Sequence, residues 1–360
     1  VKVNDLKIVE QNWTANAQGI DLQLKELSST TPDQFAGLVN GKIKLAGTTD
    51  DITPEGIKAQ GIGSLTLPEG VFAAEQLAIA DGQFKAQVIP QGVDLSLFAD
   101  PNSDDLELNG QLGGQLEVTG KVDNLSPTAV DARGKVNFSQ GIDLLEQSFG
   151  AEVVWDGKQL DVLKAKGDGL DAEGYIKLDE SFFSDIPDKL AAVDYFEFDV
   201  SQAQWIDIRK LRLTLPSWAT NLDYSGRGDF SGQISGIPSA MKINGDLGLR
   251  NFRVENIDFD PLLEGKVQVS PKKGAQLDLK EVLTFSAFSP SNQDAVSESK
   301  SQDKIELVLD SNFSPVAFAI AHDDLAVMGT GKREIVEITT QNIPVKLLKT
   351  IALKSDDFEV

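Results

Sequence analysis

The chain has 360 residues, of which 41% are hydrophobic and 25% charged, and its 56 acidic and 33 basic residues give a net charge of −23. This acidity argues against nucleic acid as a partner, because phosphate backbones are bound by clustered Lys and Arg. There is no cysteine, which excludes disulfides and thiolate metal sites.

Length alone suggests roughly two ordinary domains. No apolar run approaches the ~20 residues that a membrane-spanning helix needs. The chain starts in mid-pattern without a signal-like segment, so we expect it to be an excised part of a longer protein.

A spaced glycine and proline pattern returns along the chain. Residues 41–61 carry Gly47, Pro54 and Gly61, and residues 114–134 carry Gly120, Pro127 and Gly134 at the same intervals. A third copy with a shorter turn contains Gly236, Pro238 and Gly245. Because glycine and proline both favour turns, we interpret each copy as a β-hairpin punctuated by these residues.

Each module is followed by a second predicted hairpin. One of its strands begins after a glycine and has apolar residues at the third and fifth positions. The pairs are Leu95 and Leu97 after Gly92, Leu160 and Val162 after Gly157, and Leu277 and Leu279 after Gly274, with Leu22 and Leu24 after Gly19 as an earlier copy. A spacing of two is typical of strands, since successive side chains point to opposite faces.

This alternation predicts which residues share the apolar face of the sheet. Polar residues on the opposite face include Lys42, Lys44, Glu117, Lys135, Lys266 and Gln268. The predicted apolar lining is Ile43, Leu45, Leu65, Leu67, Leu95, Leu97, Leu116, Val118, Val136, Phe138, Leu160, Val162, Leu247, Leu249, Val267, Val269, Leu277 and Leu279. The pattern predicts an all-β fold, an antiparallel sheet of repeated hairpins with one apolar face.

A few segments depart from the strand pattern. Short helices are expected near residues 179–190, 204–211 and 343–353, since "QWIDIRKL" and "QNIPVKLL" match each other 137 residues apart (341−204). Residues 289–304 are almost devoid of apolar side chains and indicate a mobile loop. We expect one continuous array over 1–360, with approximate units 1–100, 101–211 and 212–360.

Candidate catalytic and metal sites are sparse. His322 is the only histidine, so a histidine zinc cluster cannot form, and no G-x-S-x-G motif accompanies it. The stretch "GDGLDAEG" at 167–174 is faintly similar to calcium-binding β-roll repeats, although a plain hairpin turn explains it as well. Trp13 and Trp155 are expected to pack at hairpin ends. We therefore expect a protein that is not an enzyme and has no cofactor.

Residues 228–279 resemble the repeats of the TamB translocation and assembly family, in particular its cyanobacterial and plastid branch. The line "G-x-P", then "G-x-L-x-L-x-N", then "F-D-P-L-L-x-G-x-V" matches Gly236, Pro238, Gly245, Leu247, Leu249, Asn251, Phe259, Asp260, Pro261, Leu262, Leu263, Gly265 and Val267. Earlier modules match more loosely, and longer turns at 47–54 and 120–127 depart from the family pattern.

The resemblance implies a specific architecture and role. TamB-like proteins are similar to the AsmA and bridge-like lipid-transfer group, whose long antiparallel sheets curl into an open U, or taco, with an apolar groove. It implies a periplasmic segment of an inner-membrane-anchored parent, or a plastid envelope protein. The expected cargo is phospholipid or an unfolded outer-membrane protein strand, and the expected partner is an outer-membrane barrel-assembly protein.

An alternative follows from the residues alone. A sheet with one apolar face usually buries it against a second sheet. A closed β-sandwich or β-solenoid, such as a secreted calcium-binding adhesin, is therefore the alternative to an open groove. An open groove would expose more apolar surface than the few hundred Å² usual for monomers, unless a ligand fills it.

Overall fold

The computed structural model describes residues 1–27, 35–53, 55–98, 110–142, 145, 147–184, 190–209, 223–254, 257–259, 261–282, 302–332 and 335–342. The chain divides into two compact units, Val1–Phe198 and Asp199–Val360, and strand β13 (Val193–Asp207) carries the chain from one to the other. Both units are antiparallel β-sheet, so the all-β prediction is confirmed.

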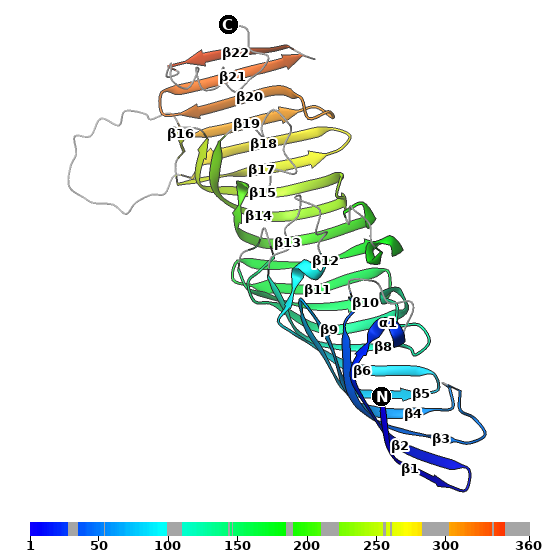
Figure 1. Ribbon diagram of the computed structural model, residues 1–360. Helices are drawn as coiled ribbons and strands as arrows, with labels where there is room; N and C mark the ends of the chain where they lie inside the picture. Colours follow the sequence, from blue (N-terminus) through cyan, green and yellow to red (C-terminus); the bar gives the residue numbers. More distant parts are fainter. Residues whose placement is uncertain are drawn as a thin grey trace, which may run out of the picture. The chain divides into compact units, whose positions relative to one another are not determined.

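In unit 1 each strand pairs with the next along the chain, except that β6 pairs with β8 and the two-residue β7 pairs beside it (Figure 1). A short helix α1, Leu24–Leu27, follows β2. The strands are β1 Lys2–Val9, β2 Asn12–Gln23, β3 Leu38–Thr48, β4 Lys58–Leu67, β5 Gly70–Ala80, β6 Gln83–Gln91, β7 Val93–Asp94, β8 Gln111–Lys121, β9 Val130–Phe138, β10 Phe149–Trp155, β11 Gln159–Gly167 and β12 Leu170–Leu178.

Unit 2 repeats this arrangement with longer first strands. A two-residue strand, β16, folds back on the end of β15, which also pairs with β17. The strands are β14 Tyr224–Ile237, β15 Ala240–Val254, β16 Ile257–Asp258, β17 Leu262–Ser270, β18 Gly274–Glu281, β19 Lys304–Leu309, β20 Pro315–His322, β21 Leu325–Lys332 and β22 Ile335–Gln341. Among the described strands of either unit, no pairing closes the sheet on itself.

The repeat seen in the sequence has a structural counterpart. The turns after β3 and β8 each contain an isolated β-bridge, Thr48 with Asp51 and Lys121 with Asn124. In each turn the second bridge residue, Asp51 or Asn124, also accepts a hydrogen bond at its side-chain Oδ1. The donor is the backbone N–H two positions further along the chain, at 3.1 Å in both copies. The two turns are thus the same Asx-type structure.

The module glycines have a different role from the predicted one. Gly61, Gly134 and Gly245 lie inside β4, β9 and β15, not in turns. A Cβ at any of them would overlap a backbone carbonyl oxygen of the neighbouring strand, from Lys42, Gln115 or Ser231 respectively. Glycine is therefore required where adjacent backbones approach closely within the sheet.

Several predicted elements are corrected by the structure. The helix expected at 204–211 is corrected in its first half: residues 204–207 continue strand β13, and Ile206 and Ile208 pack over Gly228 of the adjacent strand. Ile208 and Arg209 have 3₁₀ conformation, and residues 210–211 lie outside the described residues. Leu95 and Leu97 belong to a single 3₁₀ turn, η2 (Leu95–Phe98), which follows β7 in place of a longer strand.

The other exceptional segments have mixed outcomes. Among the described residues near 179–190, a 3₁₀ turn, η4 (Glu180–Phe183), is capped by the Asp179 side chain, and another, η5 (Leu190–Ala192), begins at Leu190. The expected helix at 343–353 lies outside the described residues, as does the expected loop at 289–304 up to residue 301. Gln302 and Asp303 lead into β19, which begins at Lys304.

Candidate functional site

The inner face of unit 1 is defined here as the side of the sheet that carries Ile43 and Leu45. Residues that pair directly across strands share a face, so the register assigns each position. From β2 to β12 the inner positions are Trp13, Ala15, Ala17, Gly19, Leu22; Val39, Gly41, Ile43, Leu45, Gly47; Ala59, Gly61, Gly63, Leu65, Leu67; Gly70, Phe72, Ala74, Leu77, Ile79; Phe84, Ala86, Val88, Pro90; Val93; Leu112, Gly114, Leu116, Val118, Gly120; Val130, Ala132, Gly134, Val136, Phe138; Phe149, Ala151, Val153, Trp155; Leu160, Val162, Ala165, Gly167; Leu170, Ala172, Gly174 and Ile176. Every one is apolar or glycine.

Burial on this face is incomplete. Ile43, Leu45, Leu65, Leu116, Val118, Phe138, Leu160 and Val162 are half-buried, whereas Leu67, Leu95, Leu97 and Val136 are buried. An apolar side chain in a closed core is normally covered completely. The middle of the inner face in unit 1 therefore keeps apolar surface in contact with solvent.

The outer face carries charged side chains that are exposed to solvent, as the alternation predicts. Lys42, Lys44 and Lys135 are exposed, and Glu117 lies between Lys85 and Arg133 of the flanking strands. Hydrogen bonds from Lys85 and then Arg133 lower the pKa of the Glu117 carboxyl below its ordinary value. Opposite charges placed across strands help to hold the register that keeps the apolar residues on the inner face.

Aromatic side chains close the ends of the inner rows. The Trp13 ring lies against Gly47, and its Nε1 donates to the Thr48 carbonyl oxygen at 3.1 Å. Trp155 Nε1 donates to the Pro127 carbonyl oxygen at 2.8 Å, and its ring meets Phe183 edge-on at 5.7 Å. Each indole N–H is thus satisfied by backbone, as predicted for hairpin ends.

The inner face of unit 2 is the side that carries Leu247 and Leu249. Register places Leu247, Leu249, Val267, Val269, Leu277 and Leu279 on it, with Lys266 and Gln268 on the other side. The same row continues through Ile305 and Leu307 to Ile320 and Phe318.

One end of this face in unit 2 is a closed core. Phe259, just after β16, is 6% exposed and packs with Ile208, Leu249, Leu263 and Leu279 in one cluster. The Phe259 N–H donates to the Phe252 carbonyl oxygen at 2.9 Å, which fixes the returning segment. Leu249 and Leu279 are consequently covered by the chain itself, while Leu247, Val267, Val269 and Leu277 stay half-buried.

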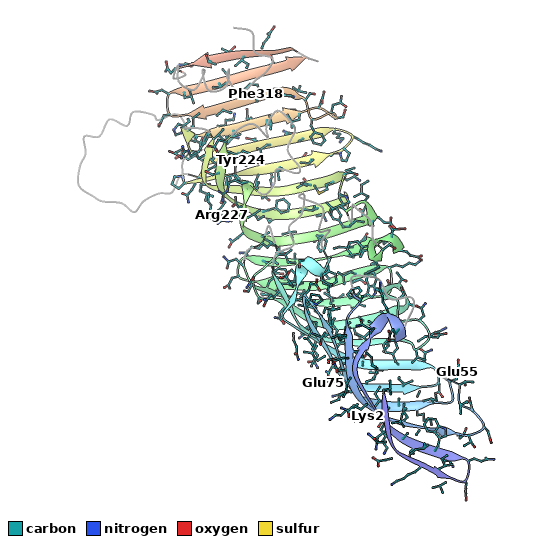
Figure 2. All side chains as sticks on the ribbon, in the orientation of Figure 1. Lys2, Glu55, Glu75, Tyr224, Arg227 and Phe318 are labelled. Carbon is teal, nitrogen blue, oxygen red and sulfur yellow. The ribbon has the colours of Figure 1, made fainter. Side chains whose placement is uncertain are left out.

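Charged groups border this cluster. The Asp207 carboxylate, 4% exposed, accepts hydrogen bonds from the Arg209 guanidinium, and these lower its pKa from 3.8 to about 2. Tyr224, labelled in Figure 2 at the start of β14, packs against the same cluster. The likewise buried Asp303 places both carboxylate oxygens 3.0 and 3.1 Å from Nδ1 of His322.

His322 ends strand β20, and its ring lies 5.4 Å from that of Phe259. Its surroundings are those of a residue that completes the edge of a core, with the second nitrogen 3.7 Å from Asp323. The backbone of its partner Asp303 is held to Glu281, whose N–H donates to the Asp303 carbonyl oxygen at 2.9 Å, and a buried carboxylate of this kind is normally hydrogen-bonded.

The 167–174 stretch forms an ordinary hairpin. Gly167 of β11 pairs with Leu170 of β12, so Asp168 and Gly169 form the two-residue turn between them. Within the described ranges, no three His, Asp or Glu side chains are grouped to hold a metal. Nor does any described helix have the length and apolar character needed to cross a bilayer.

Three features of the site escaped sequence reasoning: the close strand approach at the glycines, the 3₁₀ turn at Leu95, and the returning Phe259. The "F-D-P-L-L" phrase was a signal for the last, but alternation says nothing about a two-residue strand.

The chain matches no family model, and neither curated proteins nor solved structures include one significantly similar to it.

Proposed function

We propose that the inner face of unit 1 binds the hydrocarbon chains of a lipid and acts as part of a non-catalytic lipid conduit. The observation that carries this proposal is the inner face itself. It has no polar side chain from β2 to β12, yet Leu116, Val118 and Ile43 in its middle are only half-buried.

The energetics favour an acyl chain as the occupant. Removing apolar surface from water yields about 25 cal/mol per Å², or ~0.8 kcal/mol for each buried methylene. A chain of methylenes laid along the face gains this without needing a hydrogen-bonding partner. The rows of apolar side chains and glycines across successive strands form an apolar surface of this kind, on which an acyl chain needs no hydrogen bond.

An unfolded polypeptide strand is a poorer occupant. From β2 to β12 the N–H and C=O groups of the strands are already used in the ladders on both sides. The inner side chains offer no free donor or acceptor, since the indole N–H groups of Trp13 and Trp155 are bonded to backbone carbonyls. Each peptide group buried without a partner costs about 1–3 kcal/mol. This supports lipid over a nascent outer-membrane strand as cargo.

The cellular setting rests on the TamB resemblance. In it the chain is a periplasmic segment of an inner-membrane-anchored protein, or its plastid counterpart, and the parent works with an outer-membrane barrel-assembly protein. The half-buried apolar face supports this reading over a closed sandwich. A calcium-binding adhesin has no specific observation in its favour here.

Binding of a phospholipid with a fluorescent acyl chain tests the proposal. Leu116→Asp places a carboxylate on the inner face, and we expect it to weaken binding at least about tenfold with the fold retained by circular dichroism. Gln115→Asp, one residue away on the outer face opposite Lys135, is the matched control and should bind as the natural chain does.

Equal binding by both variants would overturn the proposal. Loss of folded structure in Leu116→Asp alone would instead support the closed-core alternative. Val118→Asp, on the same face beside Ala86 and Ala132, repeats the test at an independent position.

A further inference from the structure

Three aromatic residues of the inner faces stand directly opposite a glycine on the next strand. In an antiparallel register such partners share one face of the sheet. The pairs are Trp13 with Gly47 and Phe84 with Gly120 in unit 1, and Phe318 with Gly329 in unit 2. The same combination of an aromatic ring and a glycine therefore recurs in both units.

In unit 1 the ring of each pair occupies the space directly above its glycine. A Cβ added to Gly47 would lie 2.8 Å from Cζ2 of Trp13, and one added to Gly120 would lie 2.8 Å from Cε1 of Phe84. The hydrogen bond from Trp13 Nε1 to the Thr48 carbonyl oxygen, at 3.1 Å, holds the indole in this place. Both rings thus lie against the neighbouring strand.

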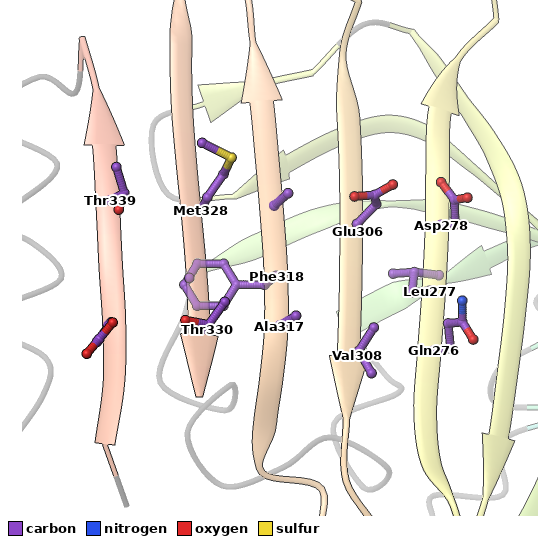
Figure 3. A pocket seen from close by; sticks show the side chains of 13 residues that line it. Gln276, Leu277, Asp278, Glu306, Val308, Ala317, Phe318, Met328, Thr330 and Thr339 are labelled. Carbon is purple, nitrogen blue, oxygen red and sulfur yellow. The ribbon is translucent and has the colours of Figure 1, made fainter. Parts of the chain in front are cut away.

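The Phe318 ring of unit 2 is placed in the same way. It reaches from β20 across to β21 and covers Gly329 (Figure 3). Gly329 is buried beneath it, whereas Met328 and Thr330 on either side point to the outer face and are exposed. The glycine is therefore shielded from solvent by the ring and not by its own strand neighbours.

The backbone does not require glycine at these three positions. None of them has a positive φ. The three atoms nearest to an added Cβ belong to side chains at Gly47, Gly120 and Gly329, whereas at Gly61 they belong to the backbone of β3. The aromatic ring is thus the group that a larger residue would displace.

A ring that lies over a glycine uses room that a Cβ would otherwise fill. Since side-chain torsions move between staggered positions, a ring displaced by a Cβ turns away from the strand and toward the open side of the face. Phe84 and Gly120 are flanked in their row by Ile79 and Val130, and all four are half-buried. A raised ring here would project into the space that an acyl chain occupies.

We propose that Gly47, Gly120 and Gly329 are positioning residues for lipid binding. Each lets an aromatic ring lie down on the sheet, which keeps the inner face clear for an acyl chain. The inference rests on the proposed hydrocarbon-binding function of unit 1, and the Phe318 pair extends it to the inner face of unit 2.

The Gly120→Ala variant tests this role, with a phospholipid that carries a fluorescent acyl chain as the probe. The new methyl group lifts the Phe84 ring, and an acyl chain that loses the contact of one methylene binds about fourfold more weakly. The atoms nearest to the methyl group belong to the side chains of Phe84 and Val130, which can move, so circular dichroism should show the fold retained. Gly47→Ala repeats the test against Trp13.

Gly113→Ala is the matched control in the same strand. Gly113 pairs with Asn137 on the outer face, and a Cβ there would lie 2.8 Å from the Asn137 Nδ2 atom. The substitution therefore displaces a side chain on the outer face, as Gly120→Ala does on the inner face. We expect Gly113→Ala to bind the lipid as the natural chain does.

Removal of the ring separates a clearing role from a merely structural one. Gly120→Ala should weaken binding in the natural chain but not in the Phe84→Leu background, where no ring is left to lift. Undiminished binding by Gly120→Ala, the same loss in Gly113→Ala, or the same loss in the Phe84→Leu background would overturn this proposal and leave the hydrocarbon-binding function standing. Unfolding of Gly120→Ala would also overturn it, since the sheet itself would then require the glycine. No binding by the natural chain would overturn both.

Discussion

The middle of the inner face in unit 1 and the closed end of that face in unit 2 have the same alternating sequence pattern but different burial. Leu116 and Val118 are half-buried, whereas Leu263 and Leu279 are 0% exposed. In unit 2 the chain returns through β16 and lays Phe259 over the leucines. Period-two alternation therefore specifies which residues share a face, and a separate covering segment decides whether that face is a core or a free surface.

Replacement of Leu263 by Asp should have the largest effect on this comparison. A carboxylate among Phe259, Leu249 and Leu279 would have no partner in the cluster, and we expect a loss of more than about 3 kcal/mol in the free energy of unfolding. Urea denaturation measures it. Because natural domains have only about 5–15 kcal/mol, unit 2 should unfold early. A fully stable Leu263→Asp variant would show that the cluster is as open as the middle of unit 1.

Acid should weaken the closed cluster more than the inner face of unit 1. Asp207 adjoins the buried Ile208, and its folded pKa of about 2 is below the ordinary 3.8. Because the pKa is lower in the folded than in the unfolded chain, ionised Asp207 stabilises the fold by about 2 kcal/mol at pH values above its unfolded pKa. This stabilisation is lost as the pH falls from about 4 through 2.

The Asp207→Asn variant checks this pH dependence. Unfolding free energies of both chains should differ by about 2 kcal/mol at pH 7 and converge near pH 2. A constant difference over that range would indicate that the Arg209 contact does not depend on the Asp207 charge.

A smaller effect is expected at the glycines where strands approach closely in unit 1. In Gly61→Ala the new methyl group would overlap the Lys42 carbonyl oxygen, and we expect a loss of about 1–3 kcal/mol. Gly150→Ala is the matched control, because a Cβ there lies at an ordinary 3.5 Å from the Val136 carbonyl oxygen. It should be neutral or slightly stabilising. Thermal unfolding of both variants decides, and equal destabilisation would contradict a special role for Gly61.

Sequence reasoning captured the antiparallel fold and the two faces because alternation is a local signal. Ile43 and Lys44 differ in face wherever a strand runs through them, whatever its neighbours. The close approach at Gly134 could not be predicted in this way, since the carbonyl it meets belongs to Gln115 on another strand.

The errors at Leu95 and at 204–207 have the same origin. Two apolar residues spaced by two suit a strand or a single tight turn, and the amphipathic spacing around Ile206 and Ile208 suits a helix or a strand. Packing against Gly228 decided the second case. The coverage of Leu249 by Phe259 was likewise a tertiary effect.

Site-specific photo-crosslinking tests the central claim most directly. A benzophenone amino acid replaces Leu45, on the inner face, or the adjacent Lys44, on the exposed outer face. The protein is incubated with phospholipid vesicles, irradiated in their presence and analysed by mass spectrometry. We predict a phospholipid adduct from position 45 and none from position 44. Equal adducts at both positions, or none at position 45, would contradict a hydrocarbon-binding inner face.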